Sequence, residues 1–146
     1  MPQEDFSCRH RLRVRWAEVD MQKIVFNGHY LTYIDTAIAD YWRAIGLAYP
    51  DGYVEKYASD VFLRKATLEY LGSARYEDEL EVFCRASRLG RSSMTFQFEI
   101  WRGTADLLIT AELVYVNAHP QSKTAVPLPE EFRRRVLAFE RTAPAQ

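Results

Sequence analysis

A single carboxylate, Asp20, precedes the dipeptide Asn27-Gly28 and an aromatic-rich segment in the stretch VDMQKIVFNGHYLTYIDTAIADYW, which runs from Val19 to Trp42. A carboxylate can act as a nucleophile or as a general base when its surroundings hold it against a substrate. A loop aspartate is also a common solvated surface residue, and its identity alone does not separate these two roles. The rest of the chain has to show whether Asp20 is placed for chemistry.

Several other catalytic motifs that a sequence can reveal are absent. The chain has no G-x-S-x-G nucleophile elbow, no P-loop and no G-x-G-x-x-G dinucleotide motif. The histidines His10, His29 and His119 are far apart, and none has a carboxylate three or four positions later that would form a helical metal site. Cys84 lies in an apolar strand pattern and Cys8 near the chain start, so neither is placed as a nucleophile. We expect no metal and no cofactor, and the search narrows to carboxylates, amides and helix ends.

The composition narrows the class of protein. With 146 residues, of which 48% are hydrophobic, the chain has the length and the apolar material for one domain spanning 1–146. The formal net charge of −1 argues against a broad basic surface, so we expect no nucleic-acid partner. No apolar stretch approaches the roughly 20 residues that span a bilayer, and the N-terminus lacks the apolar core of a signal peptide. We therefore expect no membrane partner and a cytoplasmic location.

The first strand is predicted near the N-terminus. From His10 to Trp16 the sequence HRLRVRW alternates, with Leu12, Val14 and Trp16 on one face and three arginines on the other. A period of two residues predicts a half-buried strand, because successive side chains of a strand point to opposite faces. We therefore expect the three apolar side chains, Trp16 included, to face the core.

A long helix is predicted after the Asp20 loop. Its apolar residues recur at the spacing of one helical face, and further apolar residues, Leu31, Tyr33 and Trp42, lie outside that stripe. Such a helix is predicted to be buried on most sides, with another element wrapped around it. Asn27 is the predicted N-cap and Gly46 the predicted C-terminal stop. The stripe consists of Tyr30, Ile34, Ala37, Ile38, Tyr41 and Ile45.

Four further strands are predicted after this helix. Runs rich in Val, Ile, Phe and Tyr occupy residues 61–71, 79–89, 93–101 and 107–118, and short Gly-containing polar segments separate them. One strand, one long helix and then four strands is an α+β order rather than a βαβ alternation. Residues 127–140 predict a short amphipathic C-terminal helix, on which the run of arginines at 133–135 is a solvated face rather than a nucleic-acid site.

The segment around Asp20 resembles a known family. Its members carry a motif close to D-x-D-x-x-G-x-V-[aromatic]-x-x-x-Y after the first strand. The stretch VRWAEVDMQKIVFNGHYLTYID is similar to that motif, and LRKATLEYLGSARYEDELEV and RLGRSSMTFQFEIW are similar to strands that follow in the family. Over about residues 10–120 the chain resembles the hotdog-fold acyl-CoA thioesterases of the 4-hydroxybenzoyl-CoA thioesterase type. The matching motif positions are Glu18, Asp20, Lys23, Val25, Phe26 and Tyr30.

This resemblance implies the architecture and the assembly. The family fold is an α+β hotdog, in which a curved antiparallel sheet of five or six strands wraps around one long central helix. Here a short C-terminal helix would follow. The fold explains why the predicted helix is apolar almost all round. The resemblance also implies a homodimer whose sheets join edge to edge, two such dimers paired as a homotetramer, and active sites at the dimer interface.

The resemblance further implies the reaction and the residues that perform it. Asp20 matches the catalytic carboxylate, which would act as nucleophile on an acyl-CoA thioester or as general base for water. The backbone N–H of Asn27, beside Gly28, would stabilise the negative charge that develops on the thioester oxygen. The products would be a free acid and CoA. Substrate-binding residues implied in the same way are His29, Arg88 and Arg91, with the two arginines at the CoA phosphates.

Two departures from the family pattern keep other functions open. Lys23 stands where relatives usually have glycine, and Asn27 replaces a histidine or an aromatic residue. These departures favour, as an alternative, a hotdog module that binds acyl-CoA without hydrolysing it. A hotdog hydratase is a further alternative, but its D-x-N-P-x-H-like pattern is absent from the chain.

Overall fold

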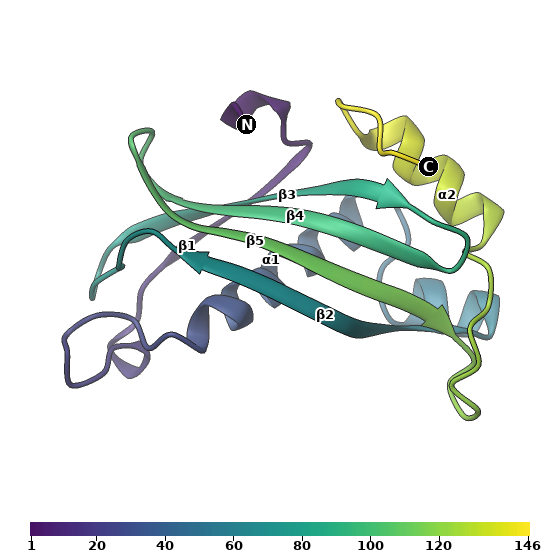
Figure 1. The fold of residues 1–146 in the computed structure, drawn as a ribbon, viewed down its shortest axis with the longest axis horizontal. Coiled ribbons are helices and arrows are strands. Elements are labelled where there is room, and N and C mark those ends of the chain that lie inside the picture. Colours follow the sequence, from purple (N-terminus) through teal and green to yellow (C-terminus); the bar gives the residue numbers. More distant parts are fainter.

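One long helix packs against one face of a five-stranded antiparallel sheet in the computed structural model of residues 1–146 (Figure 1). The strands are adjacent in the order β1-β3-β4-β5-β2, so the first two strands of the sequence form the two edges. The expected α+β hotdog architecture is confirmed, with five strands. No helix is long and apolar enough to span a membrane. The elements are β1 (Cys8–Arg13), α1 (His29–Ala44), β2 (Asp60–Tyr70), β3 (Glu79–Leu89), β4 (Ser93–Arg102), β5 (Asp106–Ala118) and α2 (Glu130–Phe139).

Helix α1 is buried on more than one side, as its sequence pattern predicts. Opposite it, every second residue of β4 from Met94 to Ile100 is buried in the same hydrophobic core. Full burial of one aliphatic or aromatic side chain contributes about 1.5–3 kcal/mol. The helix therefore cannot leave the sheet without losing the core. The buried residues of α1 are Tyr30, Tyr33, Ile34, Ala37, Tyr41 and Trp42.

The first strand is shorter than the sequence pattern predicts, because β1 gives way to a 3-10 turn at Trp16–Glu18. Val14 is fully buried as expected, whereas Trp16 is 79% exposed, so the expectation that Trp16 faces the core is wrong. The turn forms where the Glu18 carboxylate accepts the backbone N–H of Arg15 at 2.7 Å. Side chains beyond this point no longer follow the alternation of a strand.

The sequence predicts the C-terminal end of α1 correctly but places its N-cap one residue too early. The helix begins at His29 with Gly28 as N-cap, so the expected N-cap Asn27 lies one position too early. The chain already turns before the helix, because the Phe26 carbonyl accepts the His29 N–H at 2.9 Å. At the other end Gly46 has a φ of +80°, a left-handed conformation that glycine adopts without steric cost. The predicted C-terminal stop is confirmed.

The C-terminal helix α2 packs beside the end of α1. Phe132 is fully buried, and its ring lies 5.3 Å from that of Trp42. Just after α2, Glu140 is also buried, and its carboxylate accepts hydrogen bonds from the Tyr41 hydroxyl at 2.6 Å and the Ala86 N–H at 2.7 Å. These contacts confirm the amphipathic helix and attach the C-terminal segment to α1 and β3.

The arginines of α2 do not form the uniformly solvated face that the sequence predicts. Arg133 donates to the carbonyl of Gly90 at 2.5 Å, and Arg135 donates to the carbonyl of Ile45 at 3.0 Å. Two of the three guanidinium groups therefore hold neighbouring turns of the backbone. Arg134 remains exposed, as expected.

The pH dependence of stability tests the attachment of α2. Hydrogen bonds from Lys56, Tyr57 and Arg135 lower the pKa of the Glu131 carboxyl to about 2. A carboxyl whose pKa is lower in the folded protein stabilises the fold above its unfolded pKa, and the contribution is lost as pH falls through the folded value. We therefore expect Glu131→Gln to lower the free energy of unfolding at neutral pH, and the difference from wild type to vanish between about pH 5 and pH 2. Urea denaturation across this range measures the difference, and a constant difference would contradict the prediction.

Candidate active site

The loop between β1 and α1 folds back on itself around Asp20. The backbone N–H of Asp20 donates to the carbonyl of Ile24 at 3.0 Å, and the N–H of Lys23 donates to the carbonyl of Asp20 at 2.9 Å. The Asp20 carboxylate also accepts the backbone N–H of Gln22 at 2.8 Å. These bonds close a tight turn on both sides of the carboxylate. Asp20 is therefore held by local structure and does not project from an unstructured loop.

Lys23 adopts a backbone conformation that favours glycine. Its φ is +65°, in the left-handed region, where a side chain costs about 1–2 kcal/mol. This is the position at which the family motif has glycine. At Lys23 the loop therefore has a backbone conformation that a glycine would adopt without this cost.

The peptide groups just before α1 leave two donors without partners. The Phe26 carbonyl accepts the His29 N–H, and in a trans peptide the next N–H, that of Asn27, points in the opposite direction. The backbone N–H groups of Asn27 and Gly28 donate to no acceptor within the chain. Unpaired N–H groups and the helix dipole both stabilise negative charge at a helix N-terminus. The position predicted to bind an oxyanion therefore has the donors that this role requires.

Asp20 and Asn27 line the same cavity, which has a volume of about 360 Å³. It lies between the Asp20 loop, the first turn of α1 and the end of β2. Tyr70 of β2 donates its hydroxyl to the Asn27 carbonyl at 3.1 Å. Because that carbonyl and the Gly28 N–H belong to one planar peptide, Tyr70 also orients the Gly28 N–H. The lining residues are Asp20, Gln22, Ile24, Val25, Asn27, Tyr30, Tyr70, Leu71, Gly72 and Ser73.

Tyr30 and Tyr70 are candidate functional residues whose roles the sequence did not reveal. Their rings meet edge to face in the cavity wall, with centroids 5.8 Å apart. The Tyr30 hydroxyl oxygen accepts the Ala74 N–H at 3.0 Å, and burial raises the pKa of this hydroxyl. It therefore keeps its proton at neutral pH and can donate it to a ligand. The signal for Tyr70 was its place at the end of a strand, but only the fold brings that strand end beside Asn27.

Gly28 and His29 have different surroundings from those of Asp20. A Cβ atom at Gly28 would lie 3.0 Å from the Phe26 ring, so a side chain there would have to displace that ring. His29 is half-buried on the first turn of α1, with its ring in edge contact with Phe26 at 5.7 Å. It does not line the cavity that holds Asp20.

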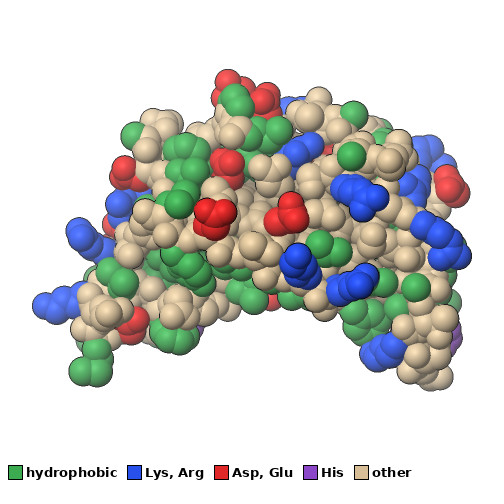
Figure 2. All heavy atoms as spheres, in the orientation of Figure 1, with side chains coloured by type: hydrophobic (Ala, Val, Ile, Leu, Met, Phe, Trp, Pro, Cys, Tyr) green, Lys and Arg blue, Asp and Glu red, His purple; other side chains and the backbone are tan.

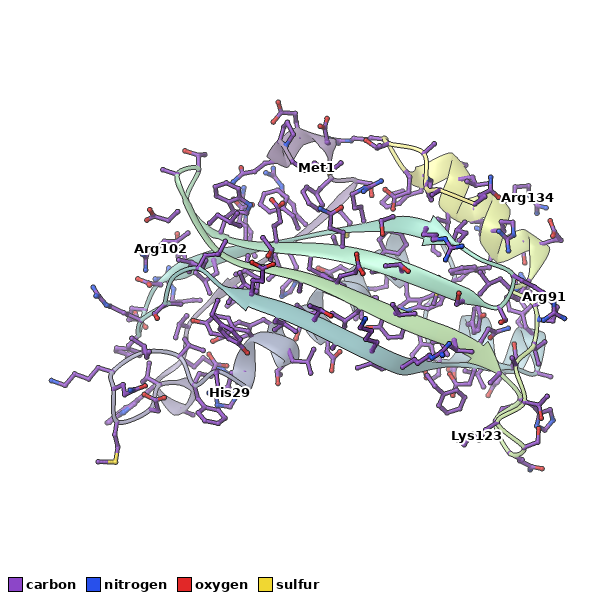
Figure 3. All side chains as sticks on the ribbon, in the orientation of Figure 1. Met1, His29, Arg91, Arg102, Lys123 and Arg134 are labelled. Carbon is purple, nitrogen blue, oxygen red and sulfur yellow. The ribbon has the colours of Figure 1, made fainter.

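The two arginines predicted at the CoA phosphates lie far from Asp20 within one chain. Arg88 is at the end of β3 and Arg91 is in the turn to β4, and both are exposed. Arg91 lies at the opposite end of the long axis from His29 (Figure 3). A single chain therefore brings Asp20 and Asn27 together in one cavity, with Gly28 next to Asn27 in the sequence, but it does not bring the arginines there.

Exposed hydrophobic side chains lie on the segments that line the cavity. They come from the two segments that line it, residues 16–26 and 71–76, and Met21 is fully exposed. Figure 2 shows hydrophobic side chains gathered at this end of the molecule. An exposed apolar patch beside a cavity is typical of a surface that binds a ligand or a partner. No group of three or more His, Cys, Asp or Glu side chains is placed to hold a metal ion. The residues of the patch are Trp16, Met21, Phe26, Leu71 and Tyr76.

The five-stranded antiparallel sheet around one central helix defines a hotdog-fold protein. One cavity at the helix N-terminus is lined by the Asp20 carboxylate and by Asn27, whose N–H is unpaired. The sequence profile described as Thioesterase superfamily matches residues 22–109, more than half of the chain. The match begins just after Asp20 and includes Asn27 and Gly28. This chain belongs to the thioesterase superfamily.

Solved structures of thioesterases are similar to this chain. A thioesterase from Thermus thermophilus, solved in complex with coenzyme A and Zn, is 28% identical, with a TM-score of 0.80 over 94% of this chain and 96% of that one. A 1,4-dihydroxy-2-naphthoyl-CoA thioesterase from Synechocystis is 17% identical, with a TM-score of 0.80 over 88% and 94% of the two chains. A DHNA-CoA thioesterase from Staphylococcus aureus is 21% identical, with a TM-score of 0.76, and the match covers 83% of this chain and 80% of that one. The last two likenesses show the fold alone.

The strain at Lys23 can be measured directly. We expect Lys23→Gly to raise the free energy of unfolding by about 0.5–1 kcal/mol, because relief of the left-handed conformation exceeds the conformational entropy that glycine adds to the unfolded chain. Lys23→Ala keeps the strain and is the matched control, expected within about 0.3 kcal/mol of wild type. Urea denaturation of the three proteins gives the comparison. A loss of stability in Lys23→Gly would show that the strain is absent.

Proposed function

We propose that this protein is an acyl-CoA thioesterase that hydrolyses a thioester to a free acid and CoA. The observation that carries the proposal is the common cavity of Asp20 and Asn27, which joins a carboxylate to an unpaired N–H at a helix N-terminus. A thioester needs only these two groups, because the thiolate leaves readily and the carbonyl oxygen becomes negative during attack.

Two routes use the same residues. On the nucleophilic route, an oxygen of Asp20 bonds to the thioester carbon, the CoA thiolate leaves, and water then cleaves the resulting anhydride. On the general-base route, Asp20 takes a proton from water as the water oxygen bonds to the carbon, and CoA leaves as the thiol. On both routes the N–H groups of Asn27 and Gly28 stabilise the negative oxygen.

The likeness to a thioesterase solved with coenzyme A supports an acyl-CoA substrate. His29, on the first turn of α1 but outside the lining of the Asp20 cavity, is the candidate for a further contact with the substrate. Arg88 and Arg91 are the candidates for the CoA phosphates. Because they lie at the other end of the chain from Asp20, this role requires a second copy of the protein.

Strand β2 offers the edge at which a second copy can join. It pairs only with β5, so backbone N–H and C=O groups along its other side are free to pair with another strand. Leu63 and Tyr70 on β2 are exposed. Antiparallel pairing of two β2 strands would place the start of one beside the end of the other. This arrangement brings the Arg91 end of one copy toward the Asp20 cavity of its partner, and pairing of two such dimers gives a homotetramer. The proposed location is the cytoplasm.

The alternatives differ from this proposal in the groups that they require. A hydratase would need a histidine together with the carboxylate, and no histidine lines the cavity of Asp20. A non-catalytic module that binds acyl-CoA would use the same cavity without cleaving the thioester. Because Lys23 has a left-handed conformation that a glycine would also adopt, its presence alone is not an argument for that module.

Thiol release from acyl-CoAs tests the proposed function. Purified protein would be supplied with short-chain, long-chain and aromatic acyl-CoAs, and free CoA would be followed with a thiol reagent. We expect release by the wild type, and we expect Asp20→Asn to lower kcat by about 100- to 10,000-fold, because the amide neither attacks the carbon nor accepts a proton.

Asp51→Asn is the matched control for this experiment. Asp51 is an exposed aspartate outside the cavity, so this variant should keep the wild-type rate. Equal rates in wild type and Asp20→Asn would refute the assignment of Asp20. Absence of release from every acyl-CoA would favour the binding module.

A further inference from the structure

We propose that Glu18 and Tyr33 are positioning residues that together set the distance between the Asp20 carboxylate and the Asn27 N–H. The inference rests on the proposed thioesterase function. Neither residue lines the cavity, so neither would touch the substrate. Their effect on the reaction would pass through the backbone that carries Asp20 and Asn27.

Glu18 is a buried carboxylate with a full set of donors. It is only 7% exposed, and a buried carboxylate is stable only where donors replace water. One oxygen accepts the Tyr33 hydroxyl at 2.9 Å and the backbone N–H of Arg15 at 2.7 Å, and the other accepts Nε of Arg15 at 2.9 Å. Such an arrangement holds the carboxylate in one place, because any displacement leaves a buried charge short of partners.

The pKa shifts of Glu18 and Tyr33 favour a hydrogen bond from the Tyr33 hydroxyl to the Glu18 carboxylate. Burial by itself would raise the pKa of the Glu18 carboxyl, but the hydrogen bonds from Arg15 and Tyr33 outweigh burial and hold the pKa below its usual range. Burial and the neighbouring Glu18 raise the pKa of the Tyr33 hydroxyl. At neutral pH, therefore, the carboxylate accepts and the hydroxyl donates.

The backbone of Glu18 connects this anchor to both reactive groups. Its carbonyl accepts the N–H of Phe26 at 2.9 Å, and the next N–H along the chain is that of Asn27. In the other direction, Asp20 follows Glu18 by two residues. One residue therefore fixes the start of the turn that carries the carboxylate and the peptide that precedes the oxyanion donor.

Tyr33 joins this anchor to the rigid part of the molecule. It is buried on α1, and its ring packs edge to face against Tyr30 at 5.9 Å. The other side chain that holds Glu18 is Arg15, and 77% of the Arg15 side chain is exposed to solvent. Loss of the Tyr33 hydroxyl would leave the Glu18 carboxylate held by Arg15 alone, through its backbone N–H and a mostly exposed side chain, with no side-chain bond to α1. A misplacement of reacting groups by about 1 Å can cost as much as 100-fold in rate.

The structure provides a matched control on the same helix. Tyr41 is also buried on α1 and also donates its hydroxyl to a buried carboxylate, that of Glu140, at 2.6 Å. This second pair anchors the C-terminal segment and has no contact with the Asp20 loop. Tyr33→Phe and Tyr41→Phe each remove one hydroxyl and keep the ring, so they lose comparable hydrogen bonds at the two ends of α1.

Steady-state kinetics distinguish a positioning role from a general loss of stability. We expect Tyr33→Phe to lower kcat about tenfold with KM within twofold of wild type, whereas Tyr41→Phe keeps both values within twofold. Glu18→Gln should also lower kcat, and the double variant Glu18→Gln/Tyr33→Phe should lose no more than the larger single loss, because both substitutions break one unit. A kcat of Tyr33→Phe within twofold of wild type, or an equal loss in Tyr41→Phe, would overturn the inference.

Hydrogen exchange of the Phe26 amide tests the same inference without activity. This N–H is protected by the Glu18 carbonyl, so we expect Tyr33→Phe to exchange it about tenfold faster than wild type, and Tyr41→Phe to leave it unchanged. An unchanged rate in Tyr33→Phe would overturn the inference whatever the kinetics. Absence of thioesterase activity in the wild type would instead refute the proposed function, and the exchange rates would still decide the role of Tyr33.

Discussion

The burial of helix α1 is the constraint on which the rest of the structure depends. Its aromatic and aliphatic side chains cover more than one side, so the sheet must pack against the helix and the C-terminal segment must pack beside its end. A helix held in this way has an N-terminus at a fixed place. The free N–H groups of Asn27 and Gly28 lie there, and Asn27 lines the same cavity as Asp20. Donors that are already in position need no reorganisation during a reaction, which is the main source of electrostatic catalysis.

Two buried tyrosine–carboxylate pairs attach two other segments of the chain to this helix. Tyr41 near one end binds Glu140 of the C-terminal segment, and Tyr33 nearer the other binds Glu18 of the Asp20 loop. In each pair the carboxylate also accepts a backbone N–H, so the buried charge is satisfied by several donors. A carboxylate of this kind tolerates little displacement, and it can therefore hold a loop in place more firmly than apolar packing alone.

Sequence reasoning succeeded where a local pattern reports a local structure. The α+β order, the long helix and its stop at Gly46 all follow from residues within a few positions of one another. It failed at Trp16, because the alternation of the first strand continues in the sequence after the chain has turned. It also placed the N-cap at Asn27, because the turn formed by the Phe26 carbonyl cannot be seen in residue types.

The sequence by itself determined the order of the elements, the family motif and the carboxylate that could react. Hydrophobic periodicity reveals the order of the elements, since the geometry of a helix or strand repeats along the chain. The motif and the carboxylate come instead from the resemblance to a family. Only the tertiary structure decided which groups share the cavity and what holds them. Tyr70 reaches Asn27 from an edge strand, Tyr33 reaches Glu18 from the helix, and Arg91 lies at the opposite end from the first helical turn. These relations join residues far apart in sequence, and packing of the sheet on the helix sets them, so no local pattern could report them.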